Sequence, residues 1–240
     1  MKRGIFTTLT ALSATFALTL SLRADELKPS QTPVSWELQV KTTTPMRITA
    51  SGGTYWYVLY TVVNNSGEDV PFHPDIVRAN EIDTEVPEAL AAKNPQAASS
   101  LTIDPAIVGP NVQLFDAIKT RHAKTHPLLV TPVNAIGTLK QGADNAVTSV
   151  AIFRDLDPRV SRFTIYFGGM SGERITRPNP LFDPKAAAAA KARGAAPDDP
   201  ALQRVFVTQK TLAMPYTLPG DVHSRRSATP VLGRMEWVMR

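Results

Sequence analysis

The sequence of 240 residues predicts an all-β fold, a β-sandwich of about seven strands with a partly helical insertion. Short runs rich in aromatic and β-branched residues recur along the chain, and several alternate between apolar and polar positions, as half-buried strands do. Clusters of Asn, Gly, Asp and Pro separate these runs and predict tight turns. This spacing fits a sandwich better than a closed barrel or a parallel sheet with crossover helices.

The first two strands are expected early in the chain. Residues 35–41 alternate, with Trp36, Leu38 and Val40 on one face, and predict a half-buried strand. Residues 54–63 are apolar or aromatic at nearly every position. We therefore expect both faces of this second strand to be covered, in the middle of a sheet.

A turn and a returning strand should follow. Residues 64–69 are rich in Asn and Gly, which tolerate the positive φ of tight turns. Residues 70–77 are expected to return as the partner of the preceding strand. Because Pro71 and Pro74 cannot donate to a ladder, this partner should lie at the edge of its sheet.

The segment 79–141 is interpreted as a partly helical insertion packed on the sandwich. Helical fragments are expected at 85–93 and 112–124, separated by Pro, Gly and Asn. The second fragment ends in a turn rich in cations, which interact favourably with the C-terminal end of a helix dipole.

Strands resume in the second half of the chain, at 146–153, 162–167, 205–212 and 231–239. Between them, 183–201 is a low-complexity segment rich in Ala and Pro. Its initial Asp-Pro pair and a later Gly suit a short helix, and the alternative is a disordered linker. In either state we expect it to act as a spacer between strands.

The N-terminal region has the layout of a secretory signal peptide. Two cations follow Met1, and residues 5–22 contain no charge. We expect cleavage after Ala24, with Ser21 as the alternative, so that residues 1–24 are removed and 25–240 form a single domain. An uncleaved anchor is the other possibility, but the run is rich in Thr and Ser and sits at the lower length limit of a membrane span. No stable membrane insertion is expected after cleavage.

Composition excludes several kinds of chemistry. The chain carries a net charge of +5, and the predicted signal peptide holds three cations and no acid, which leaves +2 on residues 25–240. This nearly balanced charge gives no footprint of a nucleic-acid binder. The chain has no cysteine, which excludes disulfides, a lipid-anchored N-terminal Cys, a thiolate nucleophile and Cys-ligated zinc or iron–sulfur clusters.

Three segments follow one another in a suggestive order: YVLYTVVNNSG at 57–67, IGTLKQG at 136–142 and SVAIF at 149–153. Together they resemble the exported immunoglobulin-like domains of unknown function found in many bacteria. In those domains an apolar strand ends in an Asn-rich turn, and a G-x-L-x-x-G turn precedes a strand that ends in Phe. The resemblance covers 36–78 and 136–168; it implies an immunoglobulin-like fold and assigns no functional residue.

Three histidines are the candidate metal ligands. His122 and His126 are four residues apart, which places both imidazoles on one face of a helix that extends that far, and His73 is a candidate third ligand. Pro127 argues against helical geometry at His126, and no Glu follows His122 in the zinc-protease pattern. Solvated helix-end residues are therefore the main interpretation of the pair.

Other short patterns have a functional and a structural interpretation. Gly169–Gly172 is similar to a nucleophile elbow around Ser171, but it lacks the last glycine and is interpreted as a turn. The carboxylate pairs lie beside prolines in predicted turns, where Asp caps its own backbone, and they are interpreted as structural instead of calcium-binding or catalytic. These pairs are Asp155 with Asp157 and Asp198 with Asp199.

Two further groups concern ligand binding. His223, Arg225 and Arg226 in the last loop have the chemistry to meet a phosphate, a sulfate or an acidic glycan, although such cations are commonly just solvated. An aromatic cluster lies in the most apolar strand, and we expect it in the core instead of on a carbohydrate-stacking surface. The cluster consists of Tyr55, Trp56, Tyr57 and Tyr60.

The leading hypothesis is an exported, non-enzymatic binding or structural module of the cell envelope, in the periplasm or outside the cell. It needs no cofactor, and its partner would be an envelope protein or a glycan. Loops should carry the contacts. Two alternatives stay open: a periplasmic metal-binding protein that uses His73, His122 and His126, and a hydrolase whose site the sequence does not reveal.

Overall fold

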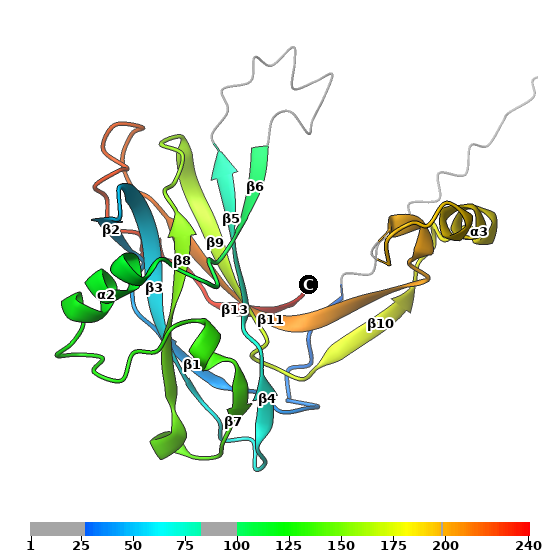
Figure 1. Ribbon diagram of the computed structural model, residues 1–240, viewed down its shortest axis with the longest axis horizontal. Coiled ribbons are helices and arrows are strands. Elements are labelled where there is room, and N and C mark those ends of the chain that lie inside the picture. Colours follow the sequence, from blue (N-terminus) through cyan, green and yellow to red (C-terminus); the bar gives the residue numbers. More distant parts are fainter. Residues whose placement is uncertain (1–26, 83–99, 198) are drawn as a thin grey trace, which may run out of the picture.

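The protein has an all-β, sandwich-like fold, seen in a computed structural model that describes residues 27–82, 100–197 and 199–240. Two antiparallel sheets pack face to face, and one helix covers the outer face of the first sheet (Figure 1). The predicted signal peptide, 1–24, and the predicted helix at 85–93 lie outside the described residues. No helix in the described ranges combines the length and the apolar character needed to span a membrane.

The first sheet is built around β3 (Gly53–Val63), which pairs from Tyr55 to Val62 with β8 (Val147–Arg154) on one side. On its other side β3 pairs with β1 (Gln39–Thr42) and then with β2 (Met46–Ala50). This confirms the central strand predicted at 54–63.

Both faces of β3 are buried, as its sequence pattern predicts. Trp56 and Tyr60 face the second sheet, where their rings contact Phe163 and Phe167. Tyr57 and its neighbours on the opposite face pack against the helix. Because side chains alternate along a strand, a strand between two covered faces must be apolar throughout. The expectation that the aromatic cluster is core is thus confirmed for Trp56, Tyr57 and Tyr60.

The second sheet contains seven strands. In spatial order its main path runs through β10, β11, β9, β5 and β6, and β12 and β13 also pair with β11. The bounds are β5 (Asp75–Ile82), β6 (Ser100–Pro105), β9 (Val160–Gly168), β10 (Arg174–Pro178), β11 (Val205–Thr217), β12 (Val231–Leu232) and β13 (Glu236–Met239).

The prediction that 70–77 returns beside the preceding strand is wrong. Only β4 (Val70–Phe72) forms an edge, and its partner is β7 (Gly137–Leu139) in a separate two-stranded sheet. After Pro74 the chain crosses to the second sheet, where β5 lies between β6 and β9. The physical reason is burial: in this position Ile76 is buried in the core between the two sheets, which favours the crossing.

The first predicted strand, 35–41, is divided between the two sheets. Leu38 donates its N–H to the carbonyl of Met170, and Trp36 accepts from the N–H of Gly172, so this part lies against the second sheet. From Gln39 onward the chain joins β3 in the first sheet. Alternation predicted the burial, but it did not identify the change of partner.

Helix α2 (Val112–Arg121) is the covering helix, and Asn111 caps it by accepting the N–H of Gln113 at 2.8 Å. It ends three residues before the predicted 112–124. Its buried face packs on the odd-numbered side of β3. The segment 79–141 holds this helix, and it also contributes the end of β5, β6 and β7 to the sheets.

Candidate functional site

The candidate site is a β-arm that projects from the second sheet, residues 174–209 (Figure 1). Strand β10 pairs with Val205–Gln209, the first five residues of β11. The rest of β11 continues into the sandwich, where it pairs with β9, β12 and β13. Strands β9 and β10 therefore line the same side of β11, separated by residues 169–173, and the hairpin that they form with β11 extends well beyond the core (Figure 1).

A buried charge cluster holds the root of the β-arm. Lys210 is 1% exposed, and its ammonium lies 2.9 Å from a carboxylate oxygen of Glu37 and 3.3 Å from one of Glu173. The same ammonium donates to the carbonyl of Ser30 at 2.9 Å and lies over the ring of Trp237. Buried charges are tolerated when paired in this way, so the root is fixed in place.

The cluster also fixes the segment that enters the first strand. Glu173 accepts the backbone N–H of Ser30 at 2.9 Å. Burial raises the pKa of Glu173, but the bonds from Ser30 and Lys210 outweigh it and hold the pKa below its usual value. The carboxylate is therefore charged at neutral pH and links residue 30 to the β-arm.

The segment between β9 and β10 includes Gly169–Gly172, which turns at Gly169 as predicted and then forms a bridge from Ser171 to Glu37. Gly169 has φ +78° and lies so close to the carbonyl of His73 that no side chain fits there. Ser171 is buried, and its hydroxyl accepts the N–H of Glu173 at 3.2 Å. This serine shapes the bend of the β-arm and is not presented as an exposed nucleophile.

The tip of the β-arm is the predicted low-complexity segment, and much of it is helical. Helix α3 (Pro184–Ala192) begins at the N-cap Asp183, whose carboxylate accepts the N–H of Lys185 at 2.9 Å. Gly194 follows the helix with φ +72°, as a C-terminal cap requires. An ion pair of 2.7 Å joins Arg193 to Asp199, so the tip has its own internal contacts.

Large apolar side chains on the β-arm face solvent. Leu181 is 87% exposed and Phe206 is 45% exposed, and Val205 and Val207 beside it are also exposed. A two-stranded ribbon is only marginally stable in water by itself. Because side chains alternate along a strand, Phe206 lies on one face of the ribbon and Val205 and Val207 on the other. Exposed apolar side chains on such a ribbon are typical of a contact surface.

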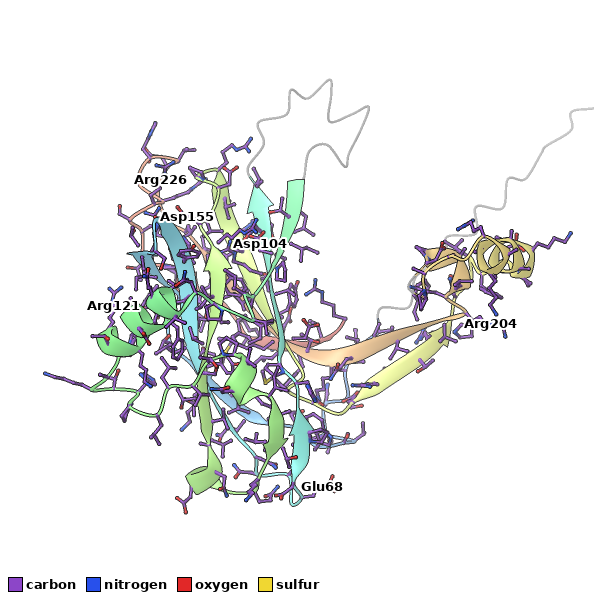
Figure 2. The ribbon with its side chains drawn as sticks, in the orientation of Figure 1. Glu68, Asp104, Arg121, Asp155, Arg204 and Arg226 are labelled. Atoms are coloured by element: carbon purple, nitrogen blue, oxygen red, sulfur yellow. The ribbon has the colours of Figure 1, made fainter. Side chains whose placement is uncertain are left out.

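The β-arm is also cationic. It carries six cations and three acids, a net charge of +3, whereas the rest of residues 25–240 sum to −1. The cations are Arg174, Arg177, Lys185, Lys191, Arg193 and Arg204. Figure 2 shows Arg204 on the β-arm, on the opposite side of the molecule from Arg121 and Arg226. The contact surface is therefore apolar and positively charged.

The three candidate metal ligands do not form one site. His122 caps α2, with its Nε2 2.9 Å from the Tyr57 hydroxyl, and the ring of His126 lies 5.8 Å away between centroids. His73 lies between β4 and β5, and the described residues contain no group of three His, Cys, Asp or Glu side chains that could hold a metal ion. Burial and the nearby His126 and Arg121 lower the pKa of His122.

The acidic pairs have structural partners. Asp155 binds Arg47 through both carboxylate oxygens and accepts the indole N–H of Trp56 at 3.0 Å. Asp157 accepts two side-chain bonds and one backbone bond from Arg159, which lower its pKa to about 2. Asp199 caps a short 3₁₀ turn. The structure does not describe Asp198.

The comparisons with known proteins add no relative. No family model matches the chain, and no match was found among curated proteins or solved structures. The class that the described structure defines is an all-β, sandwich-like protein with a projecting β-arm.

Proposed function

We propose that this chain is an exported, non-enzymatic binding module of the cell envelope that contacts another envelope protein through its β-arm. The observation that carries the proposal is the two-stranded ribbon with exposed Leu181 and Phe206, which is anchored by the ion pairs of Lys210. The leader-like N-terminus supports export.

The chemistry of the β-arm favours an acidic, partly apolar partner surface. Its cations complement an acidic surface, and its exposed apolar residues require an apolar contact. Two copies of the β-arm would place like charges together. Arg174, Arg177 and Pro178 in β10 also oppose pairing along that edge, because charge and Pro protect an edge strand. A partner with a different sequence therefore fits better than a second copy.

In-cell photocrosslinking tests the proposal. A photoreactive phenylalanine analogue at position 206 keeps the ring that the structure exposes, and the same analogue at Leu128, which is 81% exposed on the sandwich, is the matched control. We expect one discrete protein adduct from position 206 and none from position 128. The adduct should disappear when Arg177→Glu and Arg204→Glu are added, because they reverse the charge beside Phe206.

Other outcomes contradict the proposal in distinct ways. An adduct of twice the mass of the chain assigns a second copy, and a lipid adduct assigns a membrane surface. Equal crosslinking from both positions shows nonspecific proximity. A folded protein that gives no adduct at position 206 also contradicts a docking role for the β-arm.

Export has a separate measurement. N-terminal sequencing of the protein recovered from the periplasm or the medium should begin at Asp25, or at Leu22 if cleavage follows Ser21. Recovery of an intact N-terminus at Met1 from a membrane fraction would instead support an uncleaved anchor.

A further inference from the structure

A second surface lies on the side of the sandwich away from the β-arm (Figure 2). It is a pocket of about 250 Å³ between β2, the end of α2 and the loop that precedes β12. One arginine comes from each of these segments: Arg47, Arg121 and Arg226. Pro45 and Pro230 supply apolar wall, so the pocket combines positive charge with a small nonpolar surface.

Two of the arginine side chains join the three segments through backbone carbonyls. Arg121 donates to the carbonyl of Arg47 at 3.1 Å, and Arg47 donates to the carbonyl of Arg226 at 3.3 Å. Each bond joins two of the three segments. The pocket is therefore assembled from distant parts of the chain by its own cations.

The loop that carries Arg226 has internal order as well. The carboxylate of Asp221 accepts the backbone N–H groups of His223 and Ser224 at 3.1 and 2.8 Å. Arg225 binds the carbonyls of Gly220 and Arg159, which attaches the loop to the start of β9. A pocket wall that is already ordered costs less entropy when a ligand binds.

The positive charge in the pocket is not fully compensated. Arg47 pairs with Asp155 at 2.6 Å. Burial raises the pKa of Asp155, but the bonds from Arg47 and its other donors outweigh burial and hold the pKa below its usual value. This carboxylate is therefore charged, and it compensates the charge of Arg47 only. Among the described residues, Arg121 and Arg226 form no ion pair, and the guanidinium of Arg226 makes no hydrogen bond.

We infer that this pocket binds the phosphate or carboxylate group of a small, sugar-sized ligand. Guanidinium groups present paired donors that match these oxyanions, and they suit such recognition better than lysines do. The volume lies below the roughly 300–1,000 Å³ of pockets for drug-sized ligands, so the ligand is small. The inference is independent of the β-arm.

Titration of the intact domain by NMR or calorimetry tests the inference. The probes are glucose 6-phosphate, glucuronate, inorganic phosphate and neutral glucose. We expect the anions to bind and glucose not to bind. The variant Arg226→Gln should weaken anion binding about tenfold or more, because a hydrogen bond to a charged group is lost. Arg226→Gln breaks no side-chain bond in the described structure, so the variant should fold.

Arg234→Gln is the matched control, because it removes the same charge from an exposed position between β12 and β13. It should bind as the original protein does. Tighter binding of glucose 6-phosphate or glucuronate than of inorganic phosphate supports a sugar-borne anion and says which oxyanion is preferred. Binding of inorganic phosphate alone overturns the sugar-sized ligand. Equal anion binding by Arg226→Gln and the original protein contradicts this pocket as the binding site. Binding of neutral glucose contradicts recognition of the anionic group.

Discussion

Strand β11 passes through two different environments, and the contrast separates what holds the fold from what is free to bind. Residues 210–217 pair with β9 on one side and with β13 and β12 on the other, and they bury Met214 and Tyr216 in the core. Residues 205–208 pair with β10 alone, whereas Gln209 also exchanges both backbone hydrogen bonds with Arg240. Three consecutive residues from Val205 are exposed. One continuous strand is therefore both core and contact surface.

The boundary between these halves is Lys210. Its charge sits where the strand leaves solvent, and it is neutralised by Glu37 and Glu173 from two other segments. Hydrophobic burial stabilises the first environment, whereas the second keeps apolar area in water. The contacts that anchor the β-arm to the sandwich therefore lie at its root and not along its ribbon.

Lys210→Met should have the largest effect on stability, because it removes the cation that pairs with both carboxylates at the root. It leaves the buried Glu173 and the partly buried Glu37 without their cation, and we expect a loss of about 3–5 kcal/mol in the free energy of unfolding. Urea denaturation measures it. The exposed Lys185→Met on α3 is the control and should change stability by less than about 0.5 kcal/mol.

A triple variant separates buried charge from lost packing at this root. Lys210→Met combined with Glu37→Gln and Glu173→Gln no longer buries unpaired charge, so it should regain a clear part of the loss. A single Lys210→Met variant as stable as the original protein would contradict the root as a bracing cluster.

The next prediction compares the two halves of β11 directly. Met214→Ala removes a buried side chain from between the sheets, and we expect a loss of about 2–5 kcal/mol. Phe206→Ala removes a larger side chain from the β-arm, yet it should change stability by about 0.5 kcal/mol or less, because the ring already contacts water. Equal losses of stability would show that Phe206 is packed in solution, and they would contradict the difference between the two halves of β11.

The sequence predicts individual strands better than their partners. Residues 54–63 are identified as a central strand because burial on both faces requires an unbroken run of apolar residues, which the local sequence shows directly. The partner of 70–77 is not predictable in the same way. Pro74 indicates that the strand is interrupted. The sheet that the chain joins afterwards depends on contacts of Ile76 and its neighbours with residues far along the chain. Alternation encodes which face is buried, not which strand lies beside it.

The candidate site is even less predictable from local sequence patterns. Residues 205–212 have the pattern of an ordinary strand, and 183–201 has the composition of a spacer, so neither predicts a projecting β-arm. The root cluster joins Glu37, Glu173 and Lys210 across long sequence separations, and each alone resembles a solvated surface residue. Only the fold brings them together.

The smallest predicted effect concerns the root in acid. The folded-state pKa of Glu173 is held below its ordinary value of 4.5, so the unfolded chain takes up this proton first as the pH falls. Its contribution to stability is therefore fully present above about pH 4.5 and is lost as the pH drops through the lower, folded-state pKa. The original protein should lose its advantage over Glu173→Gln in this acid range.

Urea denaturation of both proteins between about pH 6 and pH 3 measures this difference, because other carboxyl groups titrate in both and cancel. Amide exchange at Ser30 gives a local readout, since its N–H donates to Glu173. Its protection should fall with acid before that of the N–H groups between β3 and β8, because those lie in the core. A stability difference that stays constant with pH would show that the Glu173 carboxylate gains nothing from the cluster, and Lys210 would then be held by Glu37, Ser30 and the ring of Trp237.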